Sequence, residues 1–188
     1  MPWRPFVLSA LALSNALAID FSLPCKDVAR TEKYAAQIEA ASKTFKVRSF
    51  AQTFDPDRKE VWREVKAITE VEGTGAAVYL NGAGILVAAF FTFQAESGDW
   101  ILYASYYYRL DGSLAQRHER LNTFQGNMSV FRDALFDCSG AKYHSTVYYR
   151  DLQTQKPKQP GPDFIDEQAP DYLTVQRLPF YSELPAKR

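Results

Sequence analysis

Apolar and aromatic runs alternate with short turn signals through the middle of the chain, a pattern typical of antiparallel strands. The pairs Asn81-Gly82, Ser97-Gly98 and Asp111-Gly112 each separate two such runs. An Asn-Gly or Asp-Gly pair in this setting favours a hairpin, because both central residues of the tightest turns need positive φ. A fourth turn over residues 137–140 predicts one more hairpin. The predicted strands are 76–80, 83–95, 99–110, 113–124, 128–136 and 142–152.

The segment 61–72 mixes apolar and charged residues and predicts a half-exposed strand ahead of these hairpins. With this segment we expect a meander of about six or seven strands over residues 61–155. Residues 26–45 have a different period, because alanine is frequent and apolar positions recur at steps of three and four without an internal Gly or Pro. That spacing predicts a helix, and we expect it to pack on the sheet.

The end of the chain is rich in proline, beginning with Pro157, Pro160 and Pro162. Proline has no N–H to donate and does not lie inside a helix or a central strand, so these residues predict an extended tail. Apolar anchors such as Phe164 and Phe180 follow, which a flexible linker would lack. We therefore expect the tail to dock on the domain or on a partner.

These patterns predict an α+β fold. It consists of an antiparallel β-meander of about six or seven strands, an N-terminal helix packed on the sheet, and an extended Pro-rich C-terminal tail. The expected organisation is a signal peptide over 1–18, a single α+β domain over 19–156 and the tail over 157–188. The 188 residues suffice for one domain with a substantial core but not for two large ones.

The first eighteen residues have the three parts of a secretory signal peptide. Arg4 supplies a short positive region, residues 6–13 form an apolar core, and Ala16 and Ala18 are the small residues that a signal peptidase needs. The apolar run is too short to span a bilayer. We therefore expect cleavage after Ala18, a secreted or periplasmic protein, and no integral membrane segment after cleavage.

Two cysteines, Cys25 and Cys138, are the full set in the chain. An even number of cysteines in an oxidising compartment favours a disulfide. That bond would join the start of the mature chain to the last predicted turn and would make Cys138 structural. Two unrelated free thiols are the alternative, and lipidation of Cys25 is a minor one that the preceding Pro24 disfavours.

Charge and composition narrow the function classes. Lys+Arg and Asp+Glu are equal at 22 each, so the formal net charge is zero. A nucleic-acid binder is typically basic, so no nucleic-acid partner is expected. Aromatic residues make up 14% of the chain, and this load suits either a packed core or an aromatic binding surface.

The hairpin of strands 99–110 and 113–124 carries the candidate ligand-binding residues. Both faces of strand 99–110 are largely apolar or aromatic, which predicts that both are covered or used. Tyrosines beside arginine, glutamine and histidine suit stacking on a sugar, holding another flat polar ligand, or gripping a peptide. The alternative is that these tyrosines only cover the helix or the tail. The candidates are Tyr103, Tyr106, Tyr107, Arg117, His118 and Arg120.

The register of this hairpin depends on the length of its turn. A two-residue turn at Asp111-Gly112 places Tyr103 opposite Arg120 and Tyr106 opposite Arg117, both suited to cation–π contacts. A three-residue turn that includes Leu110 shifts the register by one and places Tyr103 opposite Glu119. The sequence is compatible with both registers.

Motifs for catalysis or cofactor binding do not stand out. His118-Glu119 begins like a zinc-protease helix, but Asn122 stands where the second histidine is required. His118 and His144 are the only histidines, and two ligands make a weak metal site. There is no Gly-x-Ser-x-Gly elbow and no phosphate-cradling loop. We therefore assign no catalytic residue, metal or cofactor, and an enzyme is the less favoured class.

The sequence thus favours a secreted or periplasmic, non-enzymatic binding or structural protein that uses an aromatic-rich sheet. Its partner would be a carbohydrate, a peptide or an envelope protein. The first alternative is a small extracytoplasmic hydrolase in which His118 or His144 works with a carboxylate. The second is a lipid or hydrophobic-ligand carrier. Its dry cavity would be lined by Phe90, Phe91, Phe93, Trp100 and Tyr106.

Overall fold

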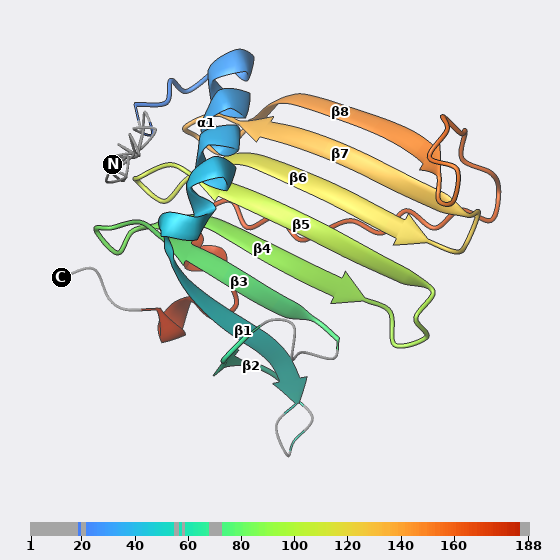
Figure 1. Ribbon diagram of the computed structural model, residues 1–188, viewed down its shortest axis with the longest axis horizontal. Coiled ribbons are helices and arrows are strands. Elements are labelled where there is room, and N and C mark those ends of the chain that lie inside the picture. The colour runs from blue at the N-terminus through green and yellow to red at the C-terminus, as the bar shows by residue number, and fades with distance from the viewer. Residues whose placement is uncertain (1–18, 20–21, 55–56, 58, 68–72, 185–188) are drawn as a thin grey trace, which may run out of the picture.

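Eight strands form one antiparallel sheet in the computed structural model, in the order β2-β1-β3-β4-β5-β6-β7-β8 (Figure 1). The structure describes residues 19, 22–54, 57, 59–67 and 73–184, so the signal peptide expected over residues 1–18 lies outside the described residues. The strands are β1 (Lys46–Phe54), β2 (Glu60–Val65), β3 (Gly75–Leu80), β4 (Leu86–Gln94), β5 (Trp100–Tyr108), β6 (Leu114–Thr123), β7 (Met128–Phe136) and β8 (Lys142–Asp151).

The predicted α+β class, with an N-terminal helix packed on an antiparallel sheet, is confirmed. The predicted number of six or seven strands is wrong, because the sheet has eight. The sequence analysis missed strand β1. Its sequence mixes short, polar and charged residues with Phe50, and it begins shortly after the helix ends. It lies between β2 and β3, so β2 pairs with β1 and does not extend the meander beside β3.

Three hairpins of the sheet share one design at intervals of 28 residues. Their turns end in Gly84, Gly112 and Gly140, each with positive φ. In the β5–β6 hairpin, the amide of Gly112 donates to the carbonyl of Arg109 and the amide of Arg109 donates to the carbonyl of Ser113 (both 2.9 Å). Each turn is therefore three residues long and ends in a left-handed residue, a conformation that glycine adopts most easily.

A β-bulge follows each of these turns and adds one residue to the second strand. The extra residues are Val87, Ala115 and Tyr143, since their neighbours pair across them. Because a bulge re-aims the side chain it adds, Val87 and Ala115 join the cluster beneath the helix. The Tyr143 hydroxyl lies 3.1 Å from that of Thr31 in the helix.

The bulge at Ala115 decides the register of the β5–β6 hairpin. The turn contains three residues, Leu110, Asp111 and Gly112, which alone would place Tyr103 opposite Glu119. The added residue shifts the pairing back, so Tyr103 lies opposite Arg120. The turn thus has three residues, as in the second predicted alternative, whereas Tyr103 lies opposite Arg120, as in the first.

Helix α1 (Val28–Ala41) lies on one face of the sheet, across the end where these three turns are (Figure 1). Asp27 caps its N-terminus, since the carboxylate accepts a hydrogen bond of 2.9 Å from the amide of Arg30. The helix is shorter than the predicted 26–45, because residues 42–44 form a 3-10 turn. It buries Thr31, Tyr34, Ala35 and Ile38. The predicted disulfide is confirmed: Cys25, just before the helix, is bonded to Cys138 in the β7–β8 turn.

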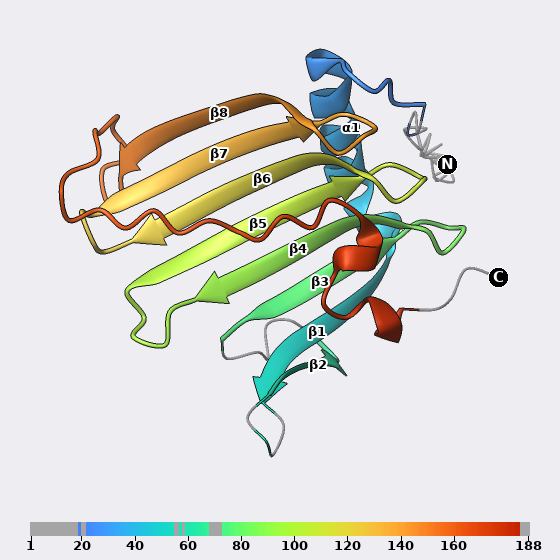
Figure 2. The ribbon, with the colours of Figure 1, turned by 180° about the vertical axis from the view of Figure 1, so that it is seen from behind.

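The opposite face of the sheet carries the main core and is crossed by the C-terminal segment (Figure 2). The hydroxyl of Tyr106 donates to the carbonyl of Pro170 (2.8 Å), and the amide of Leu114 donates to the carbonyl of Leu173 (2.9 Å). Near the end of the segment, the ring of Phe180 stacks on that of Phe50 with centroids 4.3 Å apart. The two faces therefore have different covers: α1 on the helix face, and residues 157–184, here called the strap, on the strap face.

Candidate functional site

Helix α1 covers only part of its face of the sheet. Its buried side chains meet Val87, Ala88, Tyr107 and Ala115, all close to the three-residue turns. Toward the other ends of the strands the helix leaves this face uncovered (Figure 1). Among the described segments, the turn after β8 reaches its far corner, where the Gln155 amide donates to the buried Ser129 hydroxyl (3.4 Å). The uncovered part exposes sheet side chains directly to solvent, and we call it the open face.

The strand register places ten side chains of β4–β8 on the open face in two adjacent rows. In a sheet, residues directly opposite one another on neighbouring strands point to the same side. The row nearer to α1 is Thr92, Tyr103, Arg120, Phe131 and Tyr148. The outer row is Gln94, Ile101, Asn122, Ser129 and Arg150.

Aromatic rings and guanidinium groups interleave on this surface. The rings of Phe131 and Tyr148 stack with centroids 4.8 Å apart. The guanidinium of Arg120 lies 5.5 Å from the Phe131 centroid, and that of Arg150 lies 5.6 Å from the Tyr148 centroid. Both distances are within the range of cation–π attraction. Tyr103 and Tyr148 keep 43% and 42% of their surface exposed, so both rings are accessible from solvent.

The two arginines of the open face have no acidic partner among the residues that the structure describes. In the described part of the chain, no carboxylate lies within ion-pair distance of Arg120 or Arg150, and neither row contains Asp or Glu. Their side-chain hydrogen bonds go to neutral groups: the Asn122 amide oxygen accepts from Arg120 (3.2 Å), and the carbonyl of Gln155 accepts from Arg150 (3.3 Å). The open face therefore carries uncompensated positive charge.

His118 and Asp133 form a pair between the open face and α1. Nδ1 of His118 lies 2.9 Å from Oδ1 of Asp133, and Gln116 donates to the same oxygen (3.3 Å). This hydrogen bond raises the pKa of His118 and lowers the pKa of Asp133. His144 is half-buried on the neighbouring strand, opposite Leu135.

The six sequence-predicted residues do not form one site. Tyr103, His118 and Arg120 are accessible on the helix face. Tyr107 is on the same face but is buried beneath α1, where its hydroxyl donates to a Glu39 carboxylate.

Tyr106 and Arg117 lie on the strap face, because neighbouring residues of a strand point to opposite sides. Tyr106 is fully buried, and that burial raises the pKa of its hydroxyl. Arg117 pairs with the buried Glu119 at 2.7 Å and with Asp171 of the strap. Both side chains therefore bind to the strap.

Three open-face residues were missed by the sequence analysis: Phe131, Tyr148 and Arg150. The alternation of side chains along strands 128–136 and 142–152 already places Phe131 on the face opposite to Val130, and Tyr148 on the face opposite to Val147. Their meeting with Arg120 depends on the registers of the β6–β7 and β7–β8 pairs. The β6–β7 pairing is continuous, whereas the β7–β8 register depends on the bulge at Tyr143, which no residue type indicates.

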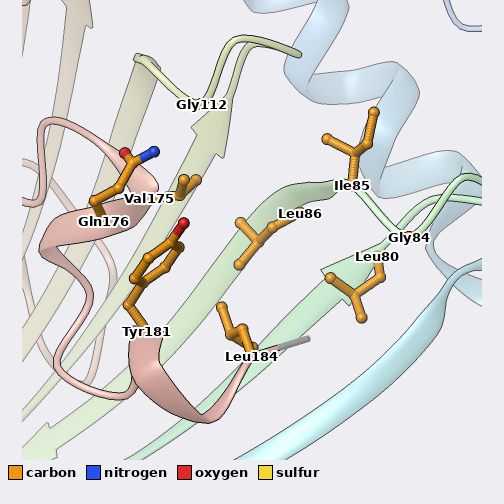
Figure 3. Close-up of a pocket in the computed structure, with 9 residues that line it drawn as sticks. All are labelled: Leu80, Gly84, Ile85, Leu86, Gly112, Val175, Gln176, Tyr181 and Leu184. Carbon is orange, nitrogen blue, oxygen red and sulfur yellow. The ribbon is translucent and has the colours of Figure 1, made fainter. Parts of the chain in front are cut away.

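The residues expected to line a lipid cavity are divided between the two faces. Phe90 packs against Tyr79 and Tyr107 on the helix face. Phe91 packs against Phe93 and Tyr106 on the strap face. A separate apolar cavity of about 70 Å³ lies between the strap and the β3–β4 turn, among Leu86, Val175 and Leu184 (Figure 3). It is far smaller than the roughly 300 Å³ or more of typical small-ligand pockets.

The described residues contain no group of three or more His, Cys, Asp and Glu side chains that could hold a metal ion. No helix in the described part of the chain is long and apolar enough to cross a membrane. Comparisons with protein-family models, with curated proteins and with solved structures found no match to this chain. The open face is therefore judged on its own geometry.

Proposed function

We propose that the protein is a secreted or periplasmic, non-enzymatic binding protein and that the open face is its ligand-binding surface. One observation carries the proposal: on the part of the helix face that α1 leaves uncovered, exposed aromatic rings gather with two arginines that have no acidic partner among the described residues. Large aromatic side chains that stay exposed beside cations on a rigid sheet are typical of a recognition surface.

Rigidity supports this role. The open face lies on β4–β8, whose inner strands are hydrogen-bonded on both sides. Side chains on paired strands need little reordering when a ligand binds, and so lose little conformational entropy. The surface also extends across five strands, which suits an extended ligand better than a small molecule.

The test compares two neighbouring residues of β8 that point to opposite faces. Tyr148→Ser removes a ring from the open face, whereas Val147→Ser changes a residue that is 50% exposed on the strap face. Ligand-observed NMR would screen neutral and acidic oligosaccharides and peptides against the purified protein. We expect Tyr148→Ser to abolish binding of the hits and Val147→Ser to preserve it. Hits that bind both variants equally would contradict the proposal.

We also infer that residues 1–18 are removed on export and that the mature chain begins at Ile19. The charged, apolar and small-residue parts of this segment support the inference, as does the Cys25–Cys138 disulfide, since disulfides persist in oxidising compartments. Mass spectrometry of the secreted or periplasmic fraction tests it. An intact N-terminus on protein recovered from that fraction would contradict it.

A second candidate function is hydrolysis, with His118 and Asp133 as an acid/base pair beside the bound ligand. The hydrogen bond of 2.9 Å between them favours it, because a carboxylate that orients an imidazole is common in such sites. If this function holds, His118→Gln would abolish turnover of a bound oligosaccharide or peptide without abolishing its binding. Absence of turnover in the unmodified protein for every ligand that binds would exclude it.

A further inference from the structure

The row of the open face that contains Tyr103 continues beyond β4 to the far edge of the sheet. Thr92 pairs with Gly75 on β3, Gly75 pairs with Ala51 on β1, and Ala51 pairs with Arg63 on β2. Arg63 is exposed. In the described part of the chain no carboxylate lies within ion-pair distance of its guanidinium.

This row therefore has, at two separated places, cations without a carboxylate partner among the described residues. Arg63 and Arg120 are five strands apart, which corresponds to about 24 Å at a strand spacing of about 4.8 Å. Between them lie Ala51 and Gly75, both buried, then the half-buried Thr92 and the exposed ring of Tyr103. Arg150 adds a third such cation one row farther from α1, beside the Phe131–Tyr148 stack.

We propose that this row binds a carboxylated polysaccharide, a chain of uronic-acid residues, laid across the strands from β2 to β8. The inference rests on the proposed binding function and names its ligand. Arg63 at one end and Arg120 and Arg150 at the other pair with sugar carboxylates. Tyr103, Phe131 and Tyr148 pack against the flat faces of the sugar rings between them.

Each part of the surface matches one part of such a ligand. The planar guanidinium fork fits a carboxylate with two parallel hydrogen bonds. Exposed rings present flat apolar area with a polar edge, which suits sugar rings. The half-buried side-chain amide of Asn122 lies beside the rings, so a polar partner for sugar hydroxyls is close by.

Other occupants fit less well. Proteins that bind nucleic acids are typically basic, whereas this chain has a formal net charge of zero. A lipid would need a cavity, and the open face is a surface. A peptide that adds a strand would need an unpaired edge, whereas the strands that carry Tyr103 and Arg120 are paired on both sides.

The experiment measures the binding of oligogalacturonates to the purified protein by calorimetry. The long oligomer used must exceed the distance from Arg63 to Arg120, and the short one must not. A neutral glucan, a sulfated glucan, polyglutamate and single-stranded DNA of matched length are the comparison ligands. We expect the long oligogalacturonate to bind most tightly, with an affinity that falls as salt screens the charges.

Charge-removing variants locate the ligand. We expect Arg120→Gln and Arg150→Gln each to weaken the binding of both oligogalacturonates about fivefold or more, as for the loss of a charge-assisted contact. Arg63→Gln should weaken binding of the long oligomer only. Arg177→Gln removes an exposed charge from the strap and is the matched control, expected to leave both affinities unchanged.

Each remaining outcome overturns one of the two proposals. If the sulfated glucan, polyglutamate or DNA binds as tightly as the oligogalacturonate, the surface is a general anion site and the uronic-acid assignment is wrong. If a neutral glycan or a peptide binds in a Tyr148-dependent manner while oligogalacturonate does not, the binding function stands and this inference fails. If oligogalacturonate binds equally to all four arginine variants, the open face is not its site.

Discussion

At the level of single residues, the His118–Asp133 pair makes stability depend on pH. Nearby charges add to both pKa shifts. Glu39 of α1 and Glu119 also raise the pKa of His118, and His144 also lowers the pKa of Asp133. A raised histidine pKa stabilises the fold fully below about pH 6.5, and this contribution is lost as pH rises through the folded value. A lowered aspartate pKa stabilises the fold above about pH 3.9 and is lost as pH falls through the folded value.

We therefore expect Asp133→Asn to reduce the free energy of unfolding most between these limits. The loss should be at most about 1 kcal/mol, because both side chains are partly exposed and water screens them. Urea denaturation at about pH 5.5 and about pH 8.5 measures it, with the larger loss at the lower pH. Asp163→Asn in the exposed part of the strap is the control. An equal loss at both pH values would show that the pair does not set this dependence.

Glu119 is the buried charge on the opposite face. Its carboxylate is fully buried between Arg117 (2.7 Å) and Arg132 (3.4 Å), and that burial raises its pKa while the two arginines oppose the shift. Glu119→Leu would leave two largely buried guanidinium groups without their central counter-ion. We expect it to lower the free energy of unfolding by about 3 kcal/mol, measured by urea denaturation.

The exposed partner of the same cluster is the control for that prediction. Asp171 of the strap pairs with Arg117, but its side chain is 64% exposed. Asp171→Asn should therefore cost less than about 1 kcal/mol. If the two substitutions had similar costs, burial would not be what makes the central carboxylate important.

At the level of elements, the equivalent turns allow a matched test of how the strap is seated. Gly84 and Gly112 occupy the same place in their turns, with φ of +74° and +87°. A Cβ at Gly84 would meet nothing within 4 Å, whereas one at Gly112 would lie 2.9 Å from a methyl group of Val175 in the strap. The two alanine variants therefore share the backbone strain and differ in the clash.

We expect Gly84→Ala to cost about 1 kcal/mol, from the left-handed backbone alone. Gly112→Ala should cost about 2 kcal/mol more, because the strap must shift away from the turn. Urea denaturation gives both values, and limited proteolysis of the strap gives a second readout, with faster cleavage expected in Gly112→Ala only. Equal costs and equal cleavage rates would mean that the strap is not packed against this turn.

The same turns show what the sequence could and could not predict. Asn81-Gly82 and Asp111-Gly112 correctly mark the β3–β4 and β5–β6 hairpins, since residues that favour tight turns are local signals. The bulges at Val87 and Ala115 are not local signals. The side chains that they add pack in the cluster beneath α1, and a one-residue shift moves every later side chain to the other face. The hairpins were therefore predictable, whereas the choice between the two registers, which decides the neighbours of Tyr103 on the open face, was not.

At the level of the whole molecule, the candidate site results from unequal covering of a two-sided sheet. The strap face is crossed by a long segment that buries Tyr106 and Glu119, whereas α1 is only fourteen residues long and covers one end of the other face. Sequence alternation assigns side chains to faces but does not say which face is covered or how far. That is why Tyr106 and Arg117 could be candidates as well as Tyr103, although alternation already places them on the opposite face.

The Cys25–Cys138 disulfide links the segment before helix α1 covalently to the sheet. It joins residues 113 positions apart, and it ties the segment before α1 to the β7–β8 turn. Closing a loop of this length restricts the unfolded chain, so the chain-entropy model gives a stabilisation of about 4–5 kcal/mol.

The double variant Cys25→Ser/Cys138→Ser should lower the free energy of unfolding by that amount in urea denaturation, with a lower Tm. Because the open face is at the other end of the strands, its ligand affinity should be unchanged at temperatures where the variant stays folded. A loss below about 1 kcal/mol would mean that the unfolded chain is already compact near these residues, and a loss of affinity in the folded variant would mean that the position of α1 controls the open face.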